Sequence, residues 1–236
     1  MQQPEEHPLS PSSTRKVTWE ADVAQHIKSI LLKDSRHNNS GPLIIGIVGI
    51  PGSGKTTSTR ILSDILKNLQ ITNMIMPMDG YHYPLSTLKS FENANDLIYR
   101  RGAPDTFNSQ SLMNDLSQIK KGLETSVPDF DHAVGDPIPN AFKFESQESA
   151  VVICEGLYLL HEDDGWNCIG NLLELTVFID ADVDICVQRL KIRNLCIPGY
   201  TKEEIELRCD AVDRVNAMIV LSSRGRATLI VSSAAL

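Results

Sequence analysis

Apolar residues along this chain follow two different spacings, and the two alternate. Short, mainly apolar runs predict strands, and the run at 43–49 is typical of a strand buried on both faces. Apolar residues three and four positions apart predict amphipathic helices. The predicted strands cover residues 43–49, 73–79, 150–156, 175–181 and 227–233, and the predicted helices cover 17–34, 55–69, 109–122, 183–195 and 201–221. This alternation indicates an α/β fold in which helices cover both faces of a mostly parallel sheet.

Three segments follow neither spacing. Residues 80–108 contain many Gly, Pro and Tyr, and we expect a long functional loop with short helices there. Residues 127–139 are expected to form a second polar loop. Residues 1–14 are rich in Pro, Ser and Glu without an apolar stretch, which predicts a disordered tail and no secretory signal. Since the rest shows no repeat and no linker, we expect residues 15–236 to form a single domain.

Composition adds mainly exclusions. The net charge of −8 argues against a nucleic acid or an anionic membrane as partner, because both attract Lys and Arg. Five cysteines, an odd number without a CxxC pair, indicate reduced thiols rather than disulfides. We therefore expect a cytoplasmic protein that acts on a small molecule. The sequence leaves nuclear access and the oligomeric state open.

The stretch GIPGSGKTT, residues 49–57, links the first predicted strand to a helix. It satisfies the spacing G-x-x-x-x-G-K-[ST] of a phosphate-binding loop, whose glycines let backbone N–H groups converge on phosphate oxygens. The predicted ligands are ATP and Mg²⁺, with Lys55 at the β- and γ-phosphates and the Thr56 hydroxyl at the metal. A plain glycine-rich turn is the alternative. The predicted nucleotide-binding residues are Gly49, Ile50, Pro51, Gly52, Ser53, Gly54, Lys55, Thr56 and Thr57.

Acidic residues stand at the ends of three predicted strands, where ligands bind in parallel sheets. Phosphoryl transfer to a hydroxyl needs a base for the acceptor and a carboxylate at the metal or its waters. Asp79 suits the base because a long polar loop follows it, and Glu155 suits the metal. Solvated strand ends or helix caps are the alternatives for both. The third acid, Asp180, lies in DADVD, which more strongly indicates a cap for the next helix.

Two arginines and several loop residues complete the candidate site. Arg189 and Arg193 are four residues apart and share a helix face, so a mobile lid could bring them onto the transferring phosphate. A solvated helix surface is the alternative, and Lys191, off that face, is expected to be solvated. The candidate acceptor-binding residues are Tyr81, Arg100, Arg101, Asp131 and His132, for which structural roles stay open. His132 has no Cys or His at metal-binding spacing, which argues against zinc.

Together these stretches resemble the uridine kinase / phosphoribulokinase / pantothenate kinase family of P-loop kinases, and most closely a fungal and bacterial subgroup labelled uridine-kinase-like or sugar-kinase-like. The resemblance runs from about Leu43 onward in GIPGSGKTT, MDGYHYP, RRGAPDTF, PDFDHAVGDP, VVICEGLYLL and RLKIR. It implies a three-layer P-loop NTPase fold with a small helical lid. It also implies that Asp79 activates the acceptor hydroxyl, that Glu155 lies at the strand-end acid position, and that Arg189 and Arg193 are lid arginines.

The expected activity is transfer of the γ-phosphoryl group of ATP to a hydroxyl of a small metabolite, with uridine as the leading acceptor. MDGYHYP departs from the D-x-F-Y loop of uridine kinases and is more similar to pantothenate kinases, but the chain lacks the additional length of the bacterial pantothenate kinases. Pantothenate and a sugar therefore stay open as acceptors. An ATPase or nucleotide switch that binds a protein partner is the alternative from another class, and the set of acids, arginines and loops disfavours it.

Overall fold

The computed structural model describes residues 18–33, 41–131, 133–163, 165–196 and 199–233. Its centre is a five-stranded sheet in the order β2-β5-β1-β6-β7, and every neighbouring pair is parallel. The strands are β1 (Leu43–Gly49), β2 (Asn73–Pro77), β5 (Val151–Gly156), β6 (Leu175–Asp180) and β7 (Leu229–Ser232). The predicted mostly parallel sheet is confirmed. The expected tail, residues 1–14, lies outside the described residues.

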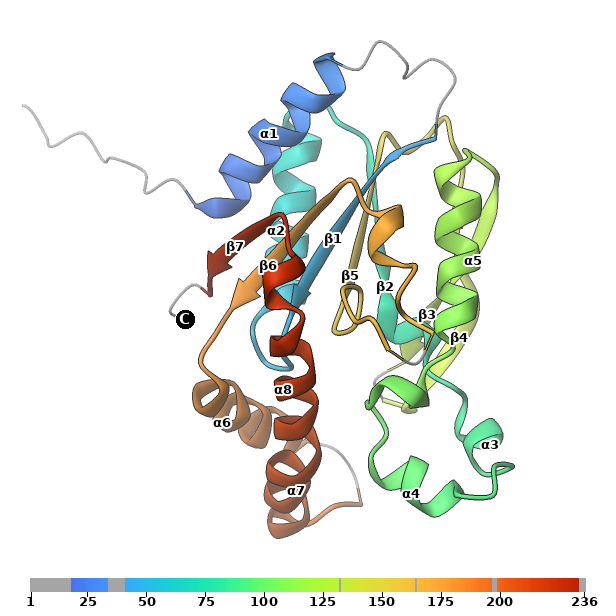
Figure 1. Cartoon of the computed structure of the whole chain (residues 1–236), viewed down its shortest axis with the longest axis vertical. Coiled ribbons are helices and arrows are strands. Elements are labelled where there is room, and N and C mark those ends of the chain that lie inside the picture. Colours follow the sequence, from blue (N-terminus) through green and yellow to red (C-terminus); the bar gives the residue numbers. More distant parts are fainter. Residues whose placement is uncertain (1–17, 34–40, 132, 164, 197–198, 234–236) are drawn as a thin grey trace, which may run out of the picture.

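Helices cover both faces of this sheet (Figure 1). β1 is buried along its whole length, and its alternate residues face two different cores. Ile45 and Ile47 share one core with residues of α1 and α2, whereas Ile44 and Val48 share the other with residues of α5 and α8. The bounds are α1 (Trp19–Lys33), α2 (Lys55–Asn68), α5 (Ser109–Lys120) and α8 (Arg214–Ser222). The result is the expected three-layer α/β fold.

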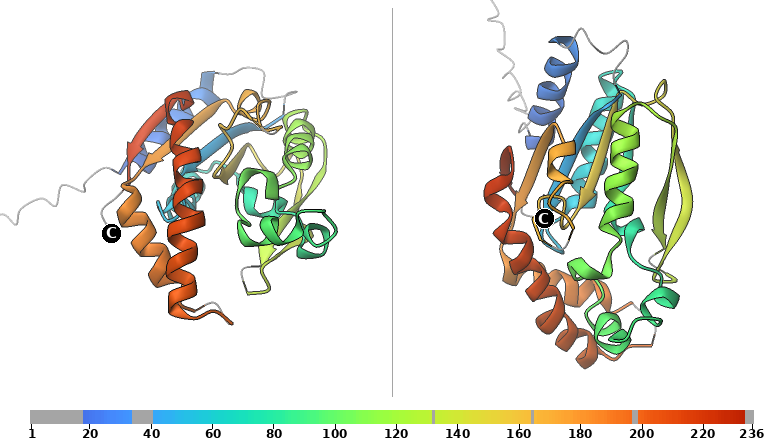
Figure 2. Two further views of the ribbon diagram at one scale, coloured as in Figure 1. Left: turned by 60° about the horizontal axis from the view of Figure 1, so that its bottom comes forward. Right: turned by 45° about the vertical axis from the view of Figure 1, so that its right-hand side comes forward.

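Two groups of short helices flank the carboxyl ends of the strands (Figures 1 and 2). On one side stand α6, α7 and a π-helical turn that precedes α8, so the predicted helix over 201–221 is three successive segments. On the other side lies the segment 80–108, which contains the expected short helices. The bounds are α3 (Leu85–Leu88), α4 (Ala94–Tyr99), α6 (Val183–Asn194), α7 (Lys202–Arg208), the π-helical turn Cys209–Asp213 and the 3₁₀ helices Met78–Tyr81, Pro104–Thr106, Gly170–Leu172 and Arg224–Arg226. No helix within the described ranges is long and apolar enough to span a bilayer.

The prediction of a second polar loop at residues 127–139 is wrong. This segment forms most of a hairpin in which β3 (Thr125–Asp131) pairs antiparallel with β4 (Asp136–Phe144), in a separate two-stranded sheet (Figure 2). Proline lacks a ladder donor and argues against a strand in a sequence pattern, and this segment holds Pro128, Pro137 and Pro139. Because most of β4 is exposed, no apolar alternation marks it either.

Candidate active site

The loop between β1 and α2 holds its glycines in the left-handed region of the backbone. Gly52 and Gly54 have φ angles of +79° and +92°, which side chains disfavour. A Cβ on Gly52 would also lie 2.7 Å from the carbonyl oxygen of Cys186 on α6. Gly54 caps α2 without a side-chain hydrogen bond. The first N–H groups of α2 therefore face a position where an anion such as phosphate can accept from them.

Lys55 begins α2 and is held against this loop. Its Nζ donates to the carbonyl oxygen of Ile50 at 3.1 Å. Burial lowers the pKa of Lys55, while the carboxylates of Glu155 and Asp79 act in the opposite direction. In the same loop the Ser53 hydroxyl oxygen is buried and has no hydrogen-bond partner among the described residues. The loop thus presents a cation and an unpaired hydroxyl beside the anion-binding amides.

Glu155 and Asp79 come from neighbouring strand ends. Pro77, the last residue of β2, lies opposite Glu155 in the sheet, and Asp79 follows in a 3₁₀ helix rather than in the strand. Glu155 is 8% exposed and accepts a hydrogen bond from Thr56 Oγ1 at 3.1 Å. Burial raises the pKa of the Glu155 carboxyl, whereas Lys55 and the Thr56 hydrogen bond lower it. The structure therefore brings the predicted residues Lys55, Thr56, Asp79 and Glu155 together.

The oxygen atoms at this point suit a magnesium ion. A hydroxyl and a carboxylate are hard oxygen ligands, and here Thr56 and Glu155 already lie within hydrogen-bond distance of each other. Mg²⁺ usually takes one or two protein ligands and completes its shell with water and phosphate. In the described part of the chain no group of three or more His, Cys, Asp or Glu could form a metal cage by itself. The donors present thus fit Mg²⁺ bound together with a nucleotide.

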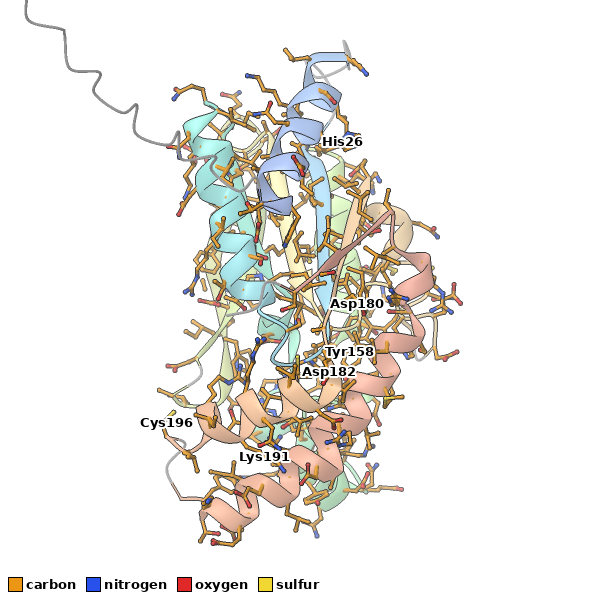
Figure 3. All side chains as sticks on the ribbon, turned by 90° about the vertical axis from the view of Figure 1, so that its left-hand side faces the viewer. His26, Tyr158, Asp180, Asp182, Lys191 and Cys196 are labelled. Atoms are coloured by element: carbon orange, nitrogen blue, oxygen red, sulfur yellow. The ribbon has the colours of Figure 1, made fainter. Side chains whose placement is uncertain are left out.

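The two predicted lid arginines lie on α6, next to the phosphate-binding loop. Arg189 Nη1 lies 3.5 Å from the carbonyl oxygen of Gly52. Arg193 is exposed, and its charge acts on Lys55. Lys191, expected to be solvated, is instead 18% exposed and pairs with Asp210 at 2.7 Å, so this expectation is wrong (Figure 3). This ion pair ties α6 to the π-helical turn.

The cap predicted for α6 is confirmed, although its atoms belong to Asp182 rather than Asp180. Asp182 accepts a hydrogen bond from the backbone N–H of Ile185 at 2.9 Å. Asp180 ends β6 and pairs with Arg224 at 2.8 Å (Figure 3). A capping box formed by Thr201 and Glu204 begins α7, at the start of the predicted helix over 201–221. These contacts fix where the helices begin, and they do not involve the phosphate-binding loop.

Tyr81 and Arg101 make well-defined contacts within the protein. Tyr81 is 3% exposed, and its hydroxyl donates to Asp115 Oδ2 at 2.7 Å. The Arg101 guanidinium donates to the carbonyl oxygen of Tyr83 at 2.9 Å, to Asp136 Oδ1 at 2.8 Å and to the Gly135 carbonyl. Arg101 thereby joins the segment 80–108 to the hairpin.

The other predicted acceptor residues lie nearer the surface. Arg100 forms ion pairs with Asp96 and Asp105. Asp131 accepts hydrogen bonds from backbone N–H groups of the hairpin turn, including that of Ala133 at 2.8 Å. His132 lies outside the described residues. None of these contacts brings Arg100 or Asp131 to the phosphate-binding loop.

Sequence reasoning missed two groups beside Asp79. The ring of His82 lies between Phe107 and Phe130, with centroid distances of 3.8 Å and 4.8 Å, and its Nδ1 lies 2.8 Å from the Asp79 carbonyl oxygen. Its position in MDGYHYP, three residues after Asp79, was the available signal. The Tyr158 hydroxyl donates to the carbonyl oxygen of Gly102 at 2.6 Å and marks the same end of the sheet. A separate cavity of about 260 Å³ between residues 160–173 and Arg226 includes none of the predicted site residues.

Comparison with known proteins gives this site a family. The phosphoribulokinase / uridine kinase family model matches residues 44–232. A Schizosaccharomyces pombe relative named "Putative uridine kinase C227.14" is 32% identical over 75% of this chain and 77% of its own length. A pantothenate kinase of Histophilus somni is 31% identical over 64% of this chain and 48% of its own. The chain thus spans about half the length of the pantothenate kinases it matches.

Solved structures agree with this assignment. A "putative fructose transport system kinase" from Silicibacter sp. TM1040 has a TM-score of 0.80 and 26% identity, over 91% of this chain and 99% of its own. Phosphoribulokinase from Rhodobacter spheroides shares the fold, with a TM-score of 0.61 at 14% identity, over 81% of this chain and 70% of its own. The matched residues 44–232 include the glycine loop and the strand-end acids. The chain therefore belongs to the phosphoribulokinase / uridine kinase family of kinases.

Proposed function

We propose that the protein is a magnesium-dependent kinase that transfers the γ-phosphoryl group of ATP to a hydroxyl of a small metabolite. One observation carries this proposal: Asp79 and Glu155, from adjacent strand ends, both act electrostatically on the half-buried Lys55 of the phosphate-binding loop. A base for a hydroxyl, a metal ligand and a phosphate-binding cation are the parts that phosphoryl transfer requires. A pure nucleotide switch has no need of the base.

Each residue then has a role. The amides of residues 49–57 and the Lys55 ammonium bind the phosphates, and Thr56 and Glu155 hold Mg²⁺, which would neutralise charge on the phosphate oxygens. Asp79 orients the acceptor hydroxyl and takes its proton. Arg189 and Arg193 add positive charge from the α6 side as the γ-phosphoryl group leaves.

The acceptor is proposed by analogy. Uridine is the leading candidate, and pantothenate or a sugar is the alternative. Since Tyr81, Arg100, Arg101 and Asp131 already bond to protein groups, we propose that they shape the acceptor side by holding its loops. Contact between His132 and the acceptor stays a prediction. All five cysteines are free thiols, which supports the proposed cytoplasmic location.

The test is ADP release with ATP, Mg²⁺ and one candidate acceptor at a time, for the wild type and Asp79→Asn. Loss of a general base lowers the rate by about 10²–10⁴-fold, so acceptor-dependent release should fall by that factor. Binding of Mg·ATP should change little because Lys55 and Thr56 are intact. Asp64→Asn, an exposed acid on α2, is the matched control.

Two outcomes would contradict the proposal. Unchanged acceptor-dependent turnover in Asp79→Asn would remove this residue from the mechanism. Hydrolysis of ATP by the wild type that no acceptor accelerates would favour an ATPase or switch.

A further inference from the structure

A cavity of about 260 Å³ takes no part in the proposed mechanism. Residues of the loop between β5 and β6 line it, together with Thr176 of β6 and the residues that lead into β7. Thr176 lies opposite Gly46 in the sheet, three residues before the phosphate-binding loop begins, so the cavity is set back from the strand ends. Its volume is just below the range of about 300–1,000 Å³ that is typical of pockets for drug-sized ligands, which suits a small metabolite.

Arg226 supplies this cavity with a charged donor. Its Nη2 pairs with Glu162 Oε2 at 2.5 Å, and its Nη1 donates to the carbonyl oxygen of Leu160 at 3.3 Å. The Arg226 and Glu162 side chains are 40% and 58% exposed, and ion pairs this exposed contribute little to stability. An oxyanion from solution can therefore replace Glu162 on the guanidinium, whose five N–H groups suit a carboxylate or a phosphate.

Neutral groups add further donors to the lining. The Asn167 and Asn171 side chains have no hydrogen-bond partner within the described part of the chain. Thr176 Oγ1 accepts from the Thr228 N–H at 2.9 Å, and Thr228 Oγ1 accepts from the Thr176 N–H at 3.3 Å. The two hydroxyl oxygens lie 3.1 Å apart, so one donates to the other, and the second hydroxyl proton is left for another acceptor.

The cavity also lies between two parts of the molecule that flank the candidate active site. The loop that lines it holds the segment that carries α3 and α4, because the Tyr158 hydroxyl donates to the Gly102 carbonyl at 2.6 Å and Trp166 Nε1 donates to the Pro104 carbonyl at 3.3 Å. On the other side, Arg226 follows α8, which comes after the lid helices α6 and α7 (Figure 1). A ligand bound to both sides would hold the loop against Gly102 and Pro104.

We propose that this cavity is a second binding site, which takes a small metabolite by a carboxylate or phosphate group on Arg226, and that its occupancy favours acceptor binding at the active site. Asn167, Asn171 and the remaining threonine hydroxyl bind the polar groups of the same ligand. The binding site is independent of the proposed kinase function, whereas the effect on the acceptor rests on it.

Calorimetric titration of the full chain tests the site. Mg·AMPPNP, a non-hydrolysable analogue of Mg·ATP, fills the phosphate-binding loop, and the probes are glycerol 3-phosphate, citrate and, as a neutral counterpart, glycerol. We expect one or both anions to bind and glycerol not to bind, and the tighter anion identifies the preferred group. Arg226→Gln should raise the Kd of that anion about tenfold or more, the usual effect of losing hydrogen bonds between charged groups. Arg224→Gln, the control, removes an arginine of the same short helix that pairs with Asp180 and should leave the Kd unchanged.

Glu162→Gln provides a test of opposite sign. Because this change releases Arg226 from its internal partner, it should lower the Kd, by up to about fivefold for an exposed ion pair. Asp163→Asn removes the same charge from the next residue without releasing Arg226 and should change the Kd little. A variant that merely damaged the loop would not tighten binding.

ADP release tests the effect on the acceptor. With the acceptor that supports turnover, the bound anion should lower the acceptor KM of the wild type about fivefold or more, the lower range of coupling between two sites. It should leave the acceptor KM of Arg226→Gln unchanged.

Each contrary result has a separate meaning. Failure of both anions to bind the wild type, or equal losses in Arg226→Gln and Arg224→Gln, would overturn the site. Binding that leaves the acceptor KM unchanged would overturn the effect on the acceptor. A wild type without acceptor-dependent ADP release would overturn the kinase proposal and that effect, while the titrations still decide whether the site exists.

Discussion

Lys55 is the side chain on which we expect phosphate binding to depend most. It is half-buried beside two carboxylates, and its Nζ donates to the carbonyl oxygen of Ile50 in the phosphate-binding loop. Lys55→Ala should lower kcat by about 10²–10³-fold, as loss of one charge-stabilising donor does. Lys67→Ala, at the exposed end of the same helix, should have no effect. ADP release measures both, and wild-type rates in Lys55→Ala would contradict the phosphate-loop assignment.

Arg189 should act mainly on the transition state. Its guanidinium lies at the Gly52 carbonyl, close to the phosphates in the proposed complex. We expect Arg189→Ala to lower kcat strongly and the affinity for ATP little, since a lid arginine meets the charge that develops during transfer. Arg214→Ala, which removes an arginine of α8 paired with Asp184 of α6, is the control. A change confined to the KM for ATP would make Arg189 a ground-state binder.

At the scale of single residues, the sequence predicts a site residue where a motif defines it, and does not where only its surroundings in the fold define it. Lys55, Thr56 and Glu155 could be predicted because a loop spacing and a strand end define them. The surroundings of Asp213 could not, because they depend on a π-helical turn and on burial, neither of which has a sequence pattern. The roles of Tyr81 and Arg101 were equally out of reach, since Asp115 and Asp136, the carboxylates they bind, are 34 and 35 residues away.

Among the elements, the β3–β4 hairpin and the segment 80–108 are joined by several contacts, and those of Arg101 can be tested by a single substitution. Arg101 is 11% exposed and donates to Asp136 and to two carbonyls. A lysine cannot reproduce this planar set of donors, so Arg101→Lys should lower the free energy of unfolding by about 2 kcal/mol. Arg100→Lys, with more exposed partners, should cost less. Urea unfolding tests this, and equal losses would show that the hairpin contact is not special.

Prediction succeeded for elements with local signals and failed where the signal was masked. The start of the helix predicted from residue 201 and the buried run of β1 are local signals, and both elements begin at or next to the expected residues. The hairpin was missed because its prolines and its exposed face remove the alternation by which strands are found. A strand outside the main sheet has few buried residues, so its sequence shows little of the apolar alternation that burial produces.

At the scale of the molecule, the strand order makes the site. β5 lies between β2 and β1, which places the ends that carry Asp79 and Glu155 next to the phosphate-binding loop. The alternation of strands and helices predicts a parallel sheet, but several strand orders satisfy it. The convergence of the acids on Lys55 therefore follows from topology, which the sequence pattern alone does not specify.

Asp213 should also couple the stability of the molecule to pH. Burial raises its pKa above the ordinary value of 3.8 against the effects of Arg208, of a hydrogen bond with Cys209 and of Arg193, and Tyr158 is the other titratable group that interacts with it. A raised pKa means that the folded state holds this proton more tightly than the unfolded chain does. Its contribution to stability is therefore fully present below pH of about 4 and is lost as the pH rises through the folded pKa.

Asp213→Asn has no proton to lose, so its Tm minus that of the wild type should be smallest at pH of about 4 and largest near neutrality. Thermal unfolding across this range measures the difference. Parallel Tm profiles would mean that Asp213 titrates as in the unfolded chain and would contradict this prediction.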